Sequence, residues 1–234
     1  MPNSTYQELQ KTQFDSIELE FKNGKKPIFV CERVSNYTED NRRCLVTVAF
    51  APPEISQVIE EKLVNPLKEI DPYQYYLPAS SLHLSLIILA YNSNPPSFTE
   101  TDVEMIKQVL NETLPKCPKI NYELSGLLVG PNSLSVRCYT GPELNQTVKE
   151  LRRKLLPLGF DIFDGLASSE IFFGNITFCR FTAEPSQKFL AKVTELKNEY
   201  IGKITPDKFN LVSSNAIFHP TKTSFYASIP IGQN

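Results

Sequence analysis

Two pairs of polar side chains stand at alternating positions in otherwise apolar runs of the sequence. His83 and Ser85 alternate with leucines, and Asn175 and Thr177 occur in the apolar run 171–181. Because residues i and i+2 of a strand point to the same face, each pair projects together, opposite an apolar, core-facing side. An imidazole beside a hydroxyl suits a phosphate group, since the ring can move a proton while the hydroxyl holds a non-bridging oxygen.

A single histidine in an apolar strand is also typical of a hydrogen-bonded core residue, and His83 alone leaves that alternative open. The second pair favours a site, because it falls at the equivalent place of a repeated unit. One unit of strand, helix, loop and strand runs from 45 to 89, and a second from 134 to 181, about 90 residues further on. The other histidine, His219, precedes a proline between two predicted strands, and we interpret it as a surface loop residue.

The elements that position these residues follow from periodicity and from turn and cap signals. Strands are predicted at 45–50, 82–89, 120–129, 134–139, 171–181, 208–218 and 224–231. Helices are predicted after Pro52-Pro53, after a capping box at Thr101-x-x-Glu104, from Glu143 to Gly159, and from Pro185 to near Gly202. We therefore predict an α+β class and a bilobal, duplicated fold, in which antiparallel sheets face a central groove with helices on the outside. His83 and Asn175 are expected on central strands of different lobes.

The domain division is predicted to be an N-terminal extension, 1–43, and one bilobal domain, 44–234. Within the extension, 17–21 alternates like a strand and 28–31 is a second apolar run, with Asn23-Gly24 between them. Because Asn-Gly is a strong hairpin signal, a hairpin is the interpretation that these features favour.

The composition excludes several classes of function. The 234 residues carry a net charge of −2, which argues against a broad basic face for nucleic acid but leaves room for a local phosphate site. Five scattered cysteines without CxxC spacing and two histidines predict no metal site and no disulfide scaffold, as expected in a reducing cytosol. The sequence has no GxGxxG or GxxxxGK loop, and we expect no cofactor. The N-terminus shows no signal peptide, and the longest apolar stretch, 84–90, is too short to span a membrane. We expect a cytoplasmic monomer without a membrane partner.

The order of elements resembles the two-histidine (2H) phosphoesterase superfamily, in particular its 2′-5′ RNA ligase-like and cyclic phosphodiesterase members. Their signature is two copies of His-x-Thr/Ser within apolar residues. Leu82-His-Leu-Ser-Leu86 fits the first copy. Phe172-Phe-Gly-Asn-Ile-Thr-Phe-Cys-Arg180 fits the second, which typically reads F-x-P-H-x-T-L-x-R, except that Gly174 and Asn175 replace the proline and the histidine. The resemblance covers about 44–231.

The resemblance implies a groove that binds RNA ends, 2′,3′-cyclic phosphates or other oligonucleotide linkages. In such a site two histidines act as acid and base without a metal, here His83 and the position of Asn175. The hydroxyls of Ser85 and Thr177 would grip the phosphate, Arg180 would add a cation, and Tyr76 of a tyrosine-rich loop would offer a stacking ring. The expected partner is therefore a nucleotide or an RNA end.

Asn175 departs from the family pattern, because its amide binds a phosphate but transfers no proton near neutral pH. Three alternatives stay open: a slow or specialised phosphodiesterase that relies on His83, a catalytically inactive nucleotide- or RNA-binding protein, or a groove with neither activity. The candidates for a substitute acid are Tyr75, Tyr76 and Tyr139, and an ordinary packing or surface role is open for Arg180.

Overall fold

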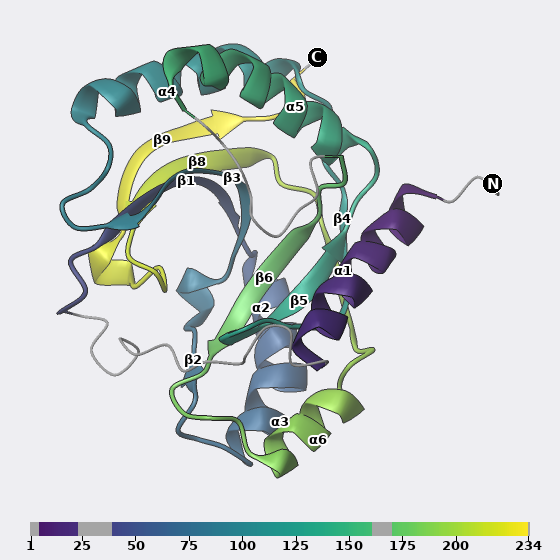
Figure 1. Ribbon diagram of the computed structural model, residues 1–234. Helices are drawn as coiled ribbons and strands as arrows, with labels where there is room; N and C mark the ends of the chain where they lie inside the picture. The colour runs from purple at the N-terminus through teal and green to yellow at the C-terminus, as the bar shows by residue number, and fades with distance from the viewer. Residues whose placement is uncertain (1–4, 23–38, 161–169, 234) are drawn as a thin grey trace.

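Two antiparallel sheets form the framework of the molecule (Figure 1). The computed structural model describes residues 5–22, 39–160 and 170–233. The four-stranded sheet has the order β3 (His83–Ser93), β1 (Arg43–Phe50), β8 (Lys208–Ser214), β9 (Ser224–Pro230). The five-stranded sheet has the order β2 (Tyr75–Tyr76), β6 (Gly174–Arg180), β5 (Ser133–Tyr139), β4 (Tyr122–Val129), β7 (Tyr200–Ile204). The α+β class and the two antiparallel sheets agree with the prediction.

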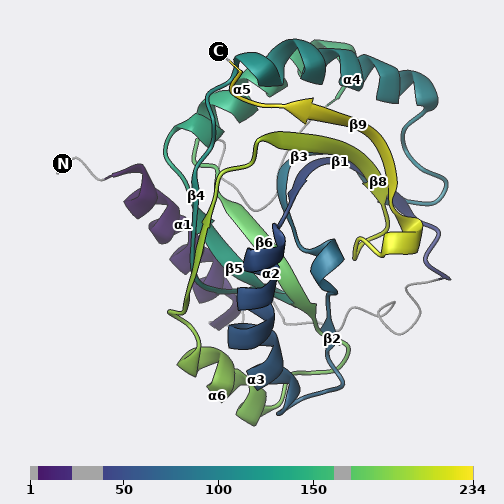
Figure 2. The same ribbon diagram turned by 180° about the vertical axis from the view of Figure 1, so that it is seen from behind.

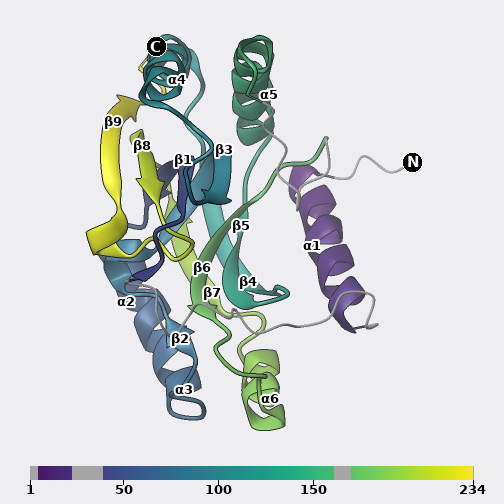
Figure 3. The same ribbon diagram turned by 60° about the vertical axis from the view of Figure 1, so that its left-hand side comes forward.

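The helices lie where the hydrophobic stripes of their sequences meet a sheet or another helix. Their bounds are α1 (Tyr6–Lys22), α2 (Pro53–Ile59), α3 (Asn65–Lys68), α4 (Glu100–Thr113), α5 (Glu143–Leu155) and α6 (Gln187–Glu195). A π-helical segment, Glu60–Val64, joins α2 to α3. Helix α4 packs against β9 with α5 beside it, α2 packs against β7, and α3 packs against α6. Helices α1 and α2 lie on opposite faces of the five-stranded sheet (Figures 1, 2 and 3).

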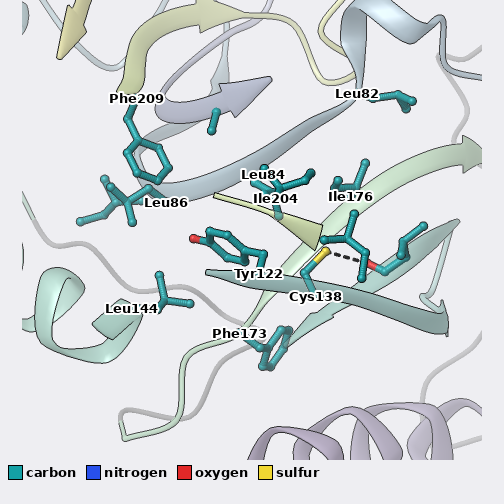
Figure 4. Packing of buried hydrophobic residues seen from close by; sticks show 14 of the residues in the cluster. Leu82, Leu84, Leu86, Tyr122, Cys138, Leu144, Phe173, Ile176, Ile204 and Phe209 are labelled. Atoms are coloured by element: carbon teal, nitrogen blue, oxygen red, sulfur yellow. Dashed lines mark hydrogen bonds between the residues drawn. The ribbon is translucent and has the colours of Figure 1, made fainter. Parts of the chain in front are cut away.

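Strands β3 and β6 bring the two sheets together, because they lie next to each other. The apolar sides of both strands enter one core, in which Leu84 of β3 lies near Tyr122, Cys138 and Ile176 of the other sheet (Figure 4). Strand β6 is an inner strand, as expected, but β3 is the edge of its sheet. The central position predicted for His83 is therefore wrong. The outer side of β3 is covered by β6 of the other sheet and not by another strand of its own sheet.

The glycine at position 174 has a packing reason. A Cβ added there would lie 2.9 Å from Cε1 of Tyr122, 3.0 Å from Cδ2 of Leu84 and 3.2 Å from Cβ of Cys138. Any larger residue would therefore push against the ring of Tyr122, which is 1% exposed. This crowding accounts for glycine where the related motif has proline.

We expect Gly174→Ala to destabilise the fold by about 1–3 kcal/mol, the usual cost of overpacking a filled core. Urea unfolding of both proteins measures the change. In a Tyr122→Leu background the same substitution should cost less, because the ring that it meets is gone. Equal costs in the two backgrounds would contradict this account of the position.

The hairpin predicted for the N-terminal extension is wrong, because part of it is helical. Residues 17–21 belong to helix α1, and the Asn-Gly turn and the run 28–31 lie outside the described residues. The i, i+4, i+7 spacing of Gln10, Phe14 and Ile17 is helical, and all three side chains are buried. The local alternation at 17–21 is a fragment of this longer helical pattern.

Smaller corrections concern the helix ends. The capping box of α4 is formed by Thr99 and Asp102, two residues before the predicted one. Helix α6 ends at Glu195, and strand β7, which contains Gly202, replaces the end predicted for it. Within the described ranges no helix has both the length and the apolar character needed to cross a membrane.

Candidate phosphate-binding groove

One groove between the two sheets collects most of the predicted site residues. Its cavity measures about 300 Å³, at the lower end of the range of small-molecule sites. The predicted residues that line it are His83, Ser85, Asn175, Thr177 and Arg180. The repeated polar pairs of β3 and β6 therefore do face one cavity, as their alternation with core residues predicts.

His83 is held from two sides. Its Nδ1 lies 2.7 Å from the carbonyl oxygen of Ser81. Because a carbonyl oxygen only accepts, Nδ1 carries the proton and Nε2 keeps the lone pair. The ring stacks on Phe218, with ring centroids 3.7 Å apart. Phe218 has a φ of 55°, the one positive φ among the described non-glycine residues, and Ser81 Oγ donates to its carbonyl oxygen at 2.7 Å.

These surroundings keep His83 neutral. Removal from water lowers the pKa of its imidazole from 6.5 to about 4; the hydrogen bond to Ser81 opposes this decrease and the Arg180 guanidinium adds to it. At neutral pH the ring is therefore neutral: the lone pair of Nε2 can accept a proton, and the Nδ1 proton is held by the carbonyl oxygen of Ser81.

The low pKa of His83 predicts a loss of stability in acid. Between about pH 6.5 and pH 4 the unfolded chain binds a proton that the folded chain refuses, so stability falls as the pH drops through this window. The contribution is of the order of 2–3 kcal/mol. Urea unfolding at pH 7 and pH 4.5 measures this loss of stability. The wild type should lose about this much more than His83→Gln, in which only the carboxylates contribute to the pH dependence. Identical pH dependence of the two proteins would contradict it.

Across the groove, the second polar pair is part of a hydroxyl and amide cluster. Ser135 of β5 is paired with Thr177 of β6, and their side-chain oxygens lie 3.0 Å apart. The amide Nδ2 of Asn175 donates to Ser135 Oγ at 3.3 Å and to Thr177 Oγ1 at 3.4 Å. These long hydrogen bonds leave groups that can re-orient toward the oxygens of a phosphate.

The charge of the groove suits a single anion. Arg180 lines it, and its Nη1 donates to Asn132 Oδ1 at 2.9 Å, which fixes the guanidinium. Among the described lining residues there is no carboxylate and no other cation. Cys44 also lines the groove, but burial raises the pKa of its thiol to about 11, so it stays protonated.

The three tyrosines considered as substitute acids do not line this groove. Tyr75 and Tyr76 form β2, and the Tyr76 hydroxyl donates to the carbonyl oxygen of Asp71 at 2.9 Å. Burial raises the pKa values of both phenols. Tyr139 packs against Phe14 of α1 instead. The stacking role predicted for Tyr76 therefore receives no support from its position.

Three further residues line the groove and were not predicted as site residues: Ser135, Asn132 and Phe218. Ser135 stands in the alternation Ser133-x-Ser135-x-Arg137, which is a polar-face signal, but its partner strand follows only from the register. Asn132 precedes that strand in a loop. Phe218 faces His83 through a left-handed backbone conformation that sequence does not signal for a phenylalanine. Within the described residues no three His, Cys, Asp or Glu side chains come together as metal ligands.

Comparison with known proteins connects this architecture to solved structures. No protein-family model and no curated protein matches the sequence. The structure is similar to the protein TT0787 of Thermus thermophilus (TM-score 0.58, 15% identity) and to a phosphoesterase (TM-score 0.57, 17% identity), in each case over 82% of this chain and all of the other. It is also similar to apo LigT of E. coli (TM-score 0.56, 16% identity, 82% and 99% covered). LigT has also been solved in complexes with phosphate and with ATP.

The fold that the two motifs predict is the fold of these neighbours, one of which is named as a phosphoesterase. The resemblance inferred from the two motifs is therefore confirmed at the level of the fold. At these identities the likeness concerns the fold and leaves the chemistry of the groove to its own residues.

Proposed function

We propose, from the fold shared with the 2H phosphoesterases and from the groove, that this chain is a phosphodiesterase-like protein that binds RNA ends or nucleotides. The linkages in question are 2′,3′-cyclic phosphates and 2′-5′ or cyclic oligonucleotide linkages. The observation that carries the proposal is one cavity that holds a neutral imidazole, a hydroxyl and amide cluster and one guanidinium. LigT, which has a similar fold, has been solved with phosphate and with ATP, and this supports a phosphate-bearing ligand.

The chemistry follows from the groups present. In the attack, Nε2 of His83 accepts the proton of a water or of a 2′-hydroxyl, while the new P–O bond forms. Arg180 and the hydroxyls of Ser85 and Thr177 hold the non-bridging oxygens. The electron pair of the breaking P–O bond goes to the leaving oxygen, toward which Asn175 can donate a hydrogen bond but no proton. Water therefore supplies the proton of the leaving oxygen and takes back the proton that Nε2 of His83 accepted. Turnover is therefore limited to what one base supports, and no step calls for a metal.

A second candidate is a catalytically inactive nucleotide- or RNA-binding protein with the same groove. It is favoured by the amide of Asn175, which already bonds to Ser135 and Thr177 as a binding residue would. In either form we propose a cytoplasmic monomer. The four free thiols among the described residues are typical of a reducing compartment such as the cytosol.

Titration calorimetry with adenosine 2′,3′-cyclic phosphate tests the proposal. We expect saturable binding that weakens at least tenfold in Arg180→Gln, because the guanidinium is the cation of the groove. Arg153→Gln is the matched control, since Arg153 is 67% exposed and pairs with Glu150 on α5. Hydrolysis of the same compound, with and without EDTA, separates the enzyme from the binding protein. The absence of binding, or equal binding by Arg180→Gln, would remove the proposal.

A further inference from the structure

Helix α1 lies on the groove face of the five-stranded sheet, where it touches the second motif. Ile17 of α1 lines the groove together with Phe173. The Tyr6 hydroxyl accepts from the backbone N–H of Phe172 at 3.1 Å and lies 3.2 Å from its carbonyl oxygen, and Gln10 Nε2 donates to the same carbonyl at 2.6 Å. The helix therefore holds both backbone groups of a residue that lies three positions before Asn175.

The same helix binds the side chain of Arg137, a cation that could otherwise face the groove. Arg137 of β5 stands directly opposite Asn175 of β6 in the register, so both belong to the face that carries the site. Its guanidinium pairs with Asp15 at 2.9 Å and Glu18 at 2.7 Å, and its exposed fraction is 5%. Lys197 completes the cluster by bonding to Glu18 at 2.6 Å. These ion pairs commit Arg137 to α1, which leaves Arg180 as the cation of the groove.

We propose that α1 is a specificity wall: it ends the groove beside Asn175, so that the site accepts a terminal phosphate and rejects a phosphate inside a continuous RNA strand. The inference rests on the proposed function. Of the linkages named there, it selects the 2′,3′-cyclic phosphate at a strand end over the 2′-5′ and cyclic oligonucleotide linkages, whose phosphates lie inside a strand. Ile17 and Phe173 line the same cavity as Asn175, and Phe14 is packed against Phe173 at 4.3 Å between ring centroids. A strand that continued past Asn175 toward α1 would meet these apolar side chains.

The charge of the groove points the same way. A strand that passes through a site brings one negative charge for each further nucleotide, and binding such a strand takes a row of cations. In the described part of the groove, Arg180 is the cation, and the one that would follow it, Arg137, is neutralised by α1. The site therefore suits a ligand with one phosphate group near its end.

Fluorescence or calorimetric titration with two probes tests the wall. Adenosine 3′-monophosphate has a terminal phosphate. An oligoadenylate of five nucleotides with hydroxyls at both ends has only internal phosphates. The wild type should bind the mononucleotide at least tenfold more tightly. Ile17→Ala should reduce this ratio at least threefold by opening the wall, and Ile17→Val should reduce it less. Leu9→Ala is the matched control, because Leu9 lies on the same helix, is 41% exposed and does not line the groove.

The outcomes separate the two proposals. Equal affinities of the wild type for both probes, with binding retained, would overturn the wall and leave the proposed function in place. A ratio that Ile17→Ala leaves unchanged would overturn it too, provided that thermal unfolding shows the variant folded. If the wild type binds neither probe, the proposed function itself fails.

Discussion

Asn175→His is expected to raise the hydrolysis of adenosine 2′,3′-cyclic phosphate by about 10²–10⁴-fold, the usual contribution of one proton-transfer group. Cleavage of a phosphodiester takes one proton from the nucleophile and delivers one to the leaving oxygen. The wild-type groove holds one imidazole, His83, which is neutral and serves the first task. A second imidazole, with a reference pKa of about 6.5, would supply the other.

The structure gives the variant a place. Asn175 is half-buried on β6 and points into the groove with Thr177, so a ring there replaces the amide without entering the core. Asparagine and histidine share their branching at Cγ, and the hydroxyls of Ser135 and Thr177 remain as partners for a ring nitrogen. The glycine before it stays, because Tyr122 fills the space that a proline would take.

Steady-state hydrolysis by three variants measures this effect. Asn175→Gln keeps an amide and should gain nothing, and adding His83→Ala to Asn175→His should remove the gain. If Asn175→His folds, binds the cyclic nucleotide and turns it over no faster than the wild type, the groove serves binding, and the inactive alternative replaces the enzyme.

His83→Ala is expected to abolish whatever turnover the wild type has, a loss of at least about 10²–10⁴-fold, because it removes the groove's single base. Binding of the cyclic nucleotide should weaken much less, since Arg180 and the hydroxyl cluster remain. The two measurements are the rate of hydrolysis and the dissociation constant of the same compound.

His219→Ala is the matched control for this variant. Its ring Nδ1 bonds within its own loop, to Thr221 at 2.8 Å, and does not line the groove. Its rate should equal that of the wild type. Hydrolysis that survives in His83→Ala at the wild-type rate would show that the reaction takes place elsewhere.

The part of the site that could be predicted from the sequence is the part that depends on strand alternation alone. His83 and Ser85 on one strand, and Asn175 and Thr177 on another, could be assigned to a polar face because their neighbours are leucine, isoleucine and phenylalanine. The repeat then placed the two strands at equivalent positions. Both steps are local or periodic, and the structure confirms that the four residues share a cavity.

The features of the site that could not be predicted depend on which distant segments of the chain contact each other. Ser135 lies opposite Thr177 because of the register of β5 and β6. Arg137 points to α1 and not into the groove because it forms ion pairs with Asp15 and Glu18. Helix α1 has a weak sequence signal because its buried side includes polar residues, Gln10 and Glu18, whose partners lie far along the chain. The Asn-Gly turn signal that follows it is stronger than this weakly apolar helical pattern.

The distance along the chain between α1 and its partners also has a consequence for synthesis. The hydrogen bond from Gln10 to Phe172 spans 162 residues, and the ion pair of Glu18 with Lys197 spans 179. At about 5–20 residues per second, the helix leaves the ribosome roughly 8–30 s or more before these partners. A segment made early is thus among the later ones to dock, and this side of the groove is completed only after Phe172 and Lys197 have emerged.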